Sequence, residues 1–213
     1  MGFNNCKPFG SSFVYISMKY FSLILCLCIA TLQVFSQQSI LNDFNDQQRH
    51  IDKTGFVVLG SWAAANIIYG GIATSGAHGS NKYFSQMNAL WNTVNLGLAV
   101  MGYVGAQKNS VLSYEKSLKK QESLEKTFLF NAGLDLAYIG SGLYLNERSK
   151  NVVKDSDKFK GYGESVLFQA GGLLIFDVIM YSLHKAHGKK LYKLAEKVQL
   201  TATCNGVGVL VRV

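Results

Sequence analysis

Two carboxylates inside apolar stretches are the residues of this chain best suited to chemistry. Asp135 lies in the apolar stretch 127–145 and Asp177 in the stretch 165–183. An acid buried in hydrocarbon is costly, so it is a functional candidate by default. At 1.5 Å per residue, the two acids lie about 12 Å and about 18 Å into antiparallel spans of a roughly 30 Å layer, near one level. Two neighbouring carboxyls would not both ionise, so the pair predicts a proton-linked or ligand-binding pocket; the alternative is a buried network that only fixes helix register.

A second group of polar side chains predicts the interior of a helical bundle. Asn88, Asn92 and Asn95 stand at i, i+4 and i+7, on one face of a helix. Each unpaired polar group in hydrocarbon costs on the order of several kcal/mol, so these amides must face other helices. The remaining residues that we assign to the polar interior are Trp62, Asn66, Trp91, Asn131, Tyr138 and Gln169. We place Trp62 at the level of the acids, with Asn66 and Asn95 about 6 Å further in.

Other candidate chemistry is weak. His184 and His187 have the i, i+3 spacing of a metal chelate, but no third ligand accompanies them. We expect both histidines at the headgroup level or near a helix C-terminus. No Gly-x-Ser-x-Gly elbow and no phosphate-binding loop is present. The sequence therefore predicts no metal, no cofactor, no catalytic residue and no enzyme.

The elements that must position these residues are four apolar stretches of about twenty residues, the length that crosses a hydrocarbon layer. They are residues 54–73, 87–106, 127–145 and 165–183. Their glycines would let membrane helices approach closely. The sequence predicts an all-α fold, a four-helix transmembrane bundle over residues 37–188. We expect a short connection at 75–86, a helical extension at 107–126 and a loop at 146–162.

The start of the chain has the three-part form of a secretory signal. Lys19 precedes an apolar run, and Ser36 offers a cleavage site, which predicts a signal peptide over 18–36 and an upstream extension over 1–17. The alternative is an uncleaved anchor. Cleavage would leave Cys204 as the last cysteine, excluding an intramolecular disulfide. Cleavage would also put Gln37 on the outer side of the membrane. The side that holds Gln37 carries thirteen Lys and Arg, against six on the other side. Because basic loops tend to lie in the cytoplasm, this count would instead put Gln37 in the cytoplasm. The sequence leaves the orientation open.

The end of the chain, residues 189–213, predicts an amphipathic segment followed by a β-hairpin. Residues 189–198 have an apolar helical face that could lie at the membrane surface. A two-residue Asn205-Gly206 turn would follow. The expected pairs are Cys204 with Val207, Ala202 with Val209, Leu200 with Val211 and Val198 with Val213. Such a hairpin needs a cover, either its own loops or a protein partner or second copy that binds residues 198–213.

Composition narrows the classes of partner. The chain carries a net charge of +8, contributed mainly by lysine, with 48% hydrophobic residues. Its basic residues lack interleaved aromatic side chains that would stack on bases, so nucleic acid is a poor partner. Lysines next to apolar spans fit the anionic surface of a lipid bilayer better.

A resemblance supports this architecture. The stretches that carry it are Trp62–Gly71, Lys82–Asn95, Asn131–Tyr138, 161–163 and the residues Gln169, Asp177 and Tyr181. Over about residues 53–188 the chain resembles an uncharacterised bacterial family of four-span helical membrane proteins without an assigned activity. The resemblance implies a multi-pass protein of the bacterial inner membrane. Its predicted role is structural or partner-binding; the alternative is small-molecule binding or proton-linked transport at Asp135 and Asp177. A cavity that reaches Asp135 would favour the alternative, and a filled core the first role.

Overall fold

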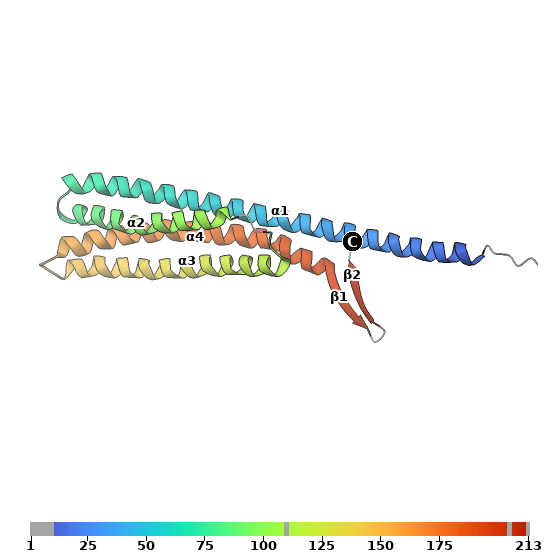
Figure 1. Cartoon of the computed structure of the whole chain (residues 1–213). Helices are drawn as coiled ribbons and strands as arrows, with labels where there is room; N and C mark the ends of the chain where they lie inside the picture. The colour runs from blue at the N-terminus through green and yellow to red at the C-terminus, as the bar shows by residue number, and fades with distance from the viewer. Residues whose placement is uncertain (1–10, 109–110, 204–205, 212–213) are drawn as a thin grey trace, which may run out of the picture. The chain divides into compact units, whose positions relative to one another are not determined.

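The structure is a computed structural model (Figure 1) that describes residues 11–108, 111–203 and 206–211, with side chains for residues 38–108 and 111–193. Its elements are α1 (Ser11–Gly76), α2 (Gly79–Gln107), α3 (Tyr114–Lys150), α4 (Ser156–Lys197), β1 (Val198–Thr203) and β2 (Gly206–Val211). The prediction of an all-α fold with four helices is confirmed. The structure describes the backbone of residues 18–36 but not their side chains, so the signal peptide predicted there lies outside the fully described residues.

The chain divides into two units, residues 1–43 and 44–213. In the first unit, α1 is helical from Ser11 onward, and Gln38 donates a hydrogen bond to Asn42 (3.0 Å). In the second unit, the four helices lie side by side and successive helices run in opposite directions, with α4 packed against both α2 and α3 (Figure 1). This arrangement brings residues from all four helices into one interior.

Glycines bring two of these helix pairs close together. A methyl group added at Gly70 would lie 2.6 Å from the carbonyl oxygen of Ser85 on α2. One added at Gly142 would lie 2.8 Å from the side chain of Leu167 on α4. Other glycines that the sequence suggested for close packing have open space beside them: Gly71, Gly97, Gly140 and Gly171. The expectation that these glycines let helices approach closely therefore holds at Gly70 and Gly142 but not at the four glycines with open space beside them.

The connections are shorter than the sequence suggested. Residues 77 and 78 alone separate α1 from α2, and Gly79 has φ +57, a conformation that favours glycine. The predicted loop at 146–162 is wrong, because only residues 151–155 break the helices there. Polar pairs such as Lys150 with Glu147 (2.7 Å) support α3 beyond its apolar stretch. The predicted helical extension before residue 126 is confirmed from Tyr114 onward, with Lys119 paired to Glu115 at 2.7 Å.

Many large apolar side chains of the bundle are exposed, and many polar side chains are buried. Large apolar side chains cover the outside: Ile72, Leu90, Met101 and Phe130 are each at least 66% exposed. Polar side chains fill much of the inside. Those with 0% exposure are Gln48, Asn88, Asn92, Ser117, Gln121, Ser165, Gln169 and His184. A bundle of this kind presents its hydrophobic surface outward.

Two segments among residues 38–108 and 111–193 are long and apolar enough to cross a membrane: Gln38–Gly76 and Ser156–Lys193. Four such spans were predicted. The stretches 87–106 and 127–145 lie within α2 and α3 as expected, but these helices do not reach the same mean hydropathy. Their buried asparagines and the charged ends of α3 lower it.

The end of the chain differs from its prediction in two respects. The segment 189–197 continues α4, so it does not form a separate surface helix. Strands β1 and β2 pair antiparallel, with Val198 opposite Val211, Leu200 opposite Val209 and Ala202 opposite Val207. The predicted register, which set Ala202 opposite Val209, is therefore wrong. The connection falls one residue earlier than an Asn205-Gly206 turn would put it, and residues 204–205 lie outside the described part of the chain.

Candidate functional site

Four side chains from three helices form what we call the amide layer: Trp62, Asn66, Asn88 and Gln169. Trp62 Nε1 of α1 donates to Gln169 Oε1 of α4 (3.2 Å). Asn88 Nδ2 of α2 donates to Asn66 Oδ1 (3.1 Å), and Gln169 Nε2 donates to Asn88 Oδ1. Among the described residues, no polar side-chain atom of this layer is buried without a hydrogen-bond partner. The layer is a closed network that joins α1, α2 and α4.

The asparagine row of α2 extends from this layer along the helix. Asn92 donates to the backbone oxygen of Asn88 (2.8 Å), and Asn95 donates to Asn92 Oδ1 (3.4 Å). All three asparagines are at most 6% exposed, as their spacing predicts. The row thus begins in the amide layer at Asn88 and ends at Asn95, which lies in a different environment.

That environment contains the acid pair, Asp135 of α3 and Asp177 of α4. The two carboxyl groups lie beside each other, and Asp135 Oδ2 is buried without a hydrogen-bond partner. Asp135 is 3% exposed and Asp177 5%. Two neighbouring carboxyls do not both ionise readily, so their protonation is coupled. Within the described chain, neither acid forms an ion pair with a Lys, Arg or His.

The acid pair lies in the wall of a cleft between α2 and α3, with a volume of about 830 Å³. The polar residues that line it are Asn95, Thr127, Asn131, Asp135, Tyr138 and Asp177. Most of the remaining wall is leucine, methionine, valine and aromatic side chains. Leu90 and Met101 line the cleft and are 66% exposed, so it opens on the surface of the bundle. Trp91 and Tyr138 meet edge to face across it, with ring centroids 4.9 Å apart.

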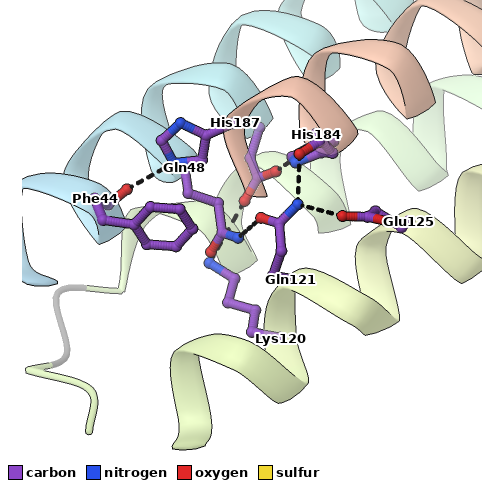
Figure 2. A network of polar contacts seen from close by, with 8 residues as sticks. Phe44, Gln48, Lys120, Gln121, Glu125, His184 and His187 are labelled. Carbon is purple, nitrogen blue, oxygen red and sulfur yellow. Dashed lines mark hydrogen bonds and ion pairs between the residues drawn. The ribbon is translucent and has the colours of Figure 1, made fainter. Parts of the chain in front are cut away.

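A third polar cluster, which we call the histidine layer, lies further along α1, α3 and α4 and consists of Gln48, Asp52, Gln121 and His184. Figure 2 shows Gln121 at its centre: it accepts from Gln48 Nε2 (2.7 Å) and donates to the backbone oxygen of His184 (2.5 Å). His184 Nε2 lies 3.2 Å from Asp52 Oδ1. Lys120 Nζ lies 3.5 Å from the other oxygen of Asp52. This layer ties the three helices together through neutral and charged contacts.

Both histidines are buried, and neither lies at a helix C-terminus, so that alternative of the prediction is wrong. His184 is 0% exposed and stacks on Phe128, while His187 bonds the backbone oxygen of Phe44 (3.0 Å) and stacks on its ring. The reason is that α4 continues to Lys197, so the histidines lie within the helix and not at its end. Among the described residues, no group of three His, Cys, Asp or Glu side chains could hold a metal ion.

The structure brings the predicted polar residues together in two places instead of one. Trp62 was placed at the level of the acids, but it bonds Gln169, which is eight residues, or about 12 Å, from Asp177 along α4. Sequence reasoning missed Gln48, Asp52 and Gln121. The i, i+4 spacing of Gln48 and Asp52 was a usable signal, but it lies before the first apolar stretch.

A known protein family matches the part of the chain that holds two of these polar clusters. The family of unknown function DUF6992 matches residues 58–178, more than half of the chain. The chain belongs to DUF6992. The match covers the amide layer and the acid pair, and it ends before His184. No curated protein and no solved structure matches this DUF6992 member.

Proposed function

We propose that this protein is an integral membrane protein that binds a small molecule in the cleft between α2 and α3, at Asp135 and Asp177. One observation carries the proposal: a buried acid pair without a cationic partner in the described chain forms part of the wall of an apolar cleft of about 830 Å³. Ligand pockets commonly have volumes of roughly 300–1,000 Å³, mostly apolar walls and a few converging polar groups. The cleft fits that description, and it is the cavity that favours ligand binding over a filled structural core.

Support for the membrane comes from the outer surface. Only 22% and 28% of the most apolar windows of Gln38–Gly76 and Ser156–Lys193 are buried inside the bundle. The core helix of a soluble protein would be mostly buried. The apolar outer sides of α2 and α3, such as Leu90, Val94 and Phe130, complete a hydrophobic surface around all four helices. A lipid bilayer is the partner that covers it, and the resemblance to bacterial proteins favours the inner membrane.

Binding without bond chemistry is the activity we propose. The groups in the cleft that could act as nucleophiles are the two carboxyls and the hydroxyls of Thr127 and Tyr138. No catalytic motif in the sequence accompanies them. Because neighbouring carboxyls titrate as a coupled pair, proton-linked release of a ligand is the natural extension of this role.

A structural or partner-binding role is the second candidate. The filled amide layer favours it, because that network needs no ligand to be satisfied. The paired strands β1 and β2 offer a place for a protein partner or a second copy. Deleting residues 199–213 tests it: an unchanged oligomeric state and unchanged co-purifying proteins would contradict this role.

The first experiment is native mass spectrometry of the purified full chain, comparing wild type with an Asp135→Asn/Asp177→Asn variant. We expect a stoichiometric small molecule on the wild type that the variant loses. Asp46→Asn is the matched control, since Asp46 is an exposed carboxylate paired with Arg49 at 2.6 Å. Wild-type protein that carries no small molecule, or only copies of itself, would contradict ligand binding.

A further inference from the structure

The charge of the acid pair sets it apart from the other paired carboxylates of the bundle. Asp46, Asp52, Glu115, Glu122 and Glu147 each have a basic partner within 3.5 Å. Asp135 and Asp177 have each other and Asn131. Asp135 Oδ2 is buried without a hydrogen-bond partner, and ionisation of either acid puts a negative charge in the cleft wall. A buried charge is costly unless it is paired, and within the described residues no side chain supplies the pairing charge.

The cleft wall defines what kind of cation fits beside this charge. Five aromatic side chains line the cleft: Phe56, Trp91, Phe128, Tyr138 and Phe176. Aromatic ring faces attract organic cations, and the leucine and methionine side chains between them favour an apolar body. A bare divalent ion is a poorer fit, because among the described residues no group of three His, Cys, Asp or Glu side chains lies together, so the two acids would be its only charged ligands.

We propose that the ligand of the cleft is an organic cation: an ammonium group held by the Asp135–Asp177 pair, on an apolar body that occupies the space between α2 and α3. This inference rests on the proposed function and names its ligand class. The ammonium supplies the missing positive charge and donates hydrogen bonds to the carboxylate oxygens. An anion of the same shape would be repelled, and a neutral molecule would leave the charge uncompensated.

The test uses Trp91 as a reporter. The chain has two tryptophans, so Trp62→Phe leaves Trp91, in the cleft wall, as the sole indole. In lipid nanodiscs this variant is titrated with three probes of equal chain length: n-decylamine, which is protonated at neutral pH, 1-decanol and decanoate. The same titration of Trp62→Phe protein that also carries Asp135→Asn/Asp177→Asn gives the signal due to partition of each probe into the lipid. Trp62→Phe protein that also carries Asp46→Asn is the control for loss of an exposed charge. Wild-type protein is examined with the same probes by native mass spectrometry, which covers any loss of stability in the Trp62→Phe background.

We expect a saturable change of Trp91 fluorescence with decylamine, at least tenfold weaker binding of decanol and none of decanoate. The acid variant should lose at least tenfold in decylamine affinity, and the Asp46→Asn variant should not. Saturable binding of decanol as tight as that of decylamine would overturn the cation and leave the binding cleft standing. If no probe binds saturably and the wild type carries no probe adduct, the proposal that the cleft binds a small molecule is overturned as well. A dimer whose Trp91 fluorescence does not respond to any of the three probes would also overturn it.

Discussion

The amide layer and the acid pair are both buried inside one bundle, yet their surroundings differ. Asn66, Asn88 and Gln169 are at most 9% exposed, and the acids are 3% and 5% exposed. The amides bond one another across α1, α2 and α4, whereas the acids form part of the wall of an open cleft. Burial alone therefore does not distinguish the two regions. The acids differ from the amides in that they border free space and have no basic partner among the described residues.

The difference follows from the chemistry of the side chains. A carboxamide is neutral and carries both donors and acceptors, so a closed set of amides and one indole can satisfy itself. A pair of neighbouring carboxyls has acceptors but few donors, so when either ionises it depends on a group from outside the pair. On the proposed function, the first arrangement stabilises helix packing and the second is the position of the ligand.

The largest effect should come from opening the amide layer. Gln169→Leu would leave the Trp62 indole N–H and the Asn88 carbonyl without their partner, at roughly 1–3 kcal/mol per orphaned group. We expect a loss of about 3 kcal/mol in the free energy of unfolding, measured by reversible denaturation in mixed micelles. Asp177→Asn should change it by less than about 1 kcal/mol, because an amide of nearly the same shape can donate a hydrogen bond to the remaining carboxyl of Asp135. Equal losses for the two variants would remove the distinction between the layers.

A smaller effect should separate the two tryptophans. Trp62→Phe removes one hydrogen bond, to Gln169, and should cost about 1 kcal/mol of stability. Trp91→Phe keeps an aromatic ring against Tyr138 and should cost less than about 0.5 kcal/mol, while weakening decylamine binding by about threefold. Thermal unfolding and an adduct titration by native mass spectrometry measure both quantities. A larger stability loss at Trp91 than at Trp62 would contradict the assignment of the cleft as the less structural region.

A still smaller stability change should accompany a change in cleft shape. A methyl group at Gly102 would meet the ring of Phe56, and both residues line the cleft. Gly102→Ala should lower decylamine affinity by about fivefold, with less than about 1 kcal/mol lost from the free energy of unfolding. Gly97→Ala is the matched control, because nothing lies within 4 Å of the added methyl. Unchanged affinity in Gly102→Ala would place the ligand away from this wall.

The smallest effect is expected at the edge of the histidine layer, where, unlike in the amide layer, buried atoms such as Gln48 Oε1 and His184 Nδ1 have no hydrogen-bond partner. Lys120 is 37% exposed and lies 3.5 Å from Asp52, whose other oxygen faces His184. Lys120→Met should therefore cost only about 0.5 kcal/mol. Lys119→Met, in an exposed pair with Glu115, gives the reference value in the same denaturation assay. A loss of several kcal/mol would show that Lys120 is an essential counter-charge of Asp52.

Spacing within one helix proved more informative than depth across helices. The i, i+4, i+7 row of Asn88, Asn92 and Asn95 is sufficient to predict a buried face. Counting residues along two antiparallel stretches placed Asp135 and Asp177 at one level, and in the structure both line the same cleft. The same count misplaced Trp62, because α1 is helical from Ser11 and an apolar stretch beginning at residue 54 does not fix its offset.

The cleft itself and the histidine layer could not be predicted in this way. A cleft depends on how far α2 and α3 lie apart, and side-chain spacing within each helix does not encode that distance. Gln48, Asp52 and Gln121 stand in polar stretches outside the apolar segments, where polar residues are ordinarily solvated. Only tertiary packing shows that they are buried.

The sideways opening of the cleft has a consequence for how affinity must be expressed. Leu90, Val94 and Met101 at its mouth belong to the hydrophobic outer surface, so in a bilayer the mouth faces acyl chains. A ligand would then arrive by two-dimensional diffusion within the leaflet, after partitioning from water. The dissociation constant would be a mole fraction relative to lipid, and an aqueous value would change with the amount of lipid in the assay. Selection for apolar bodies would thus begin in the membrane, before any contact with the protein.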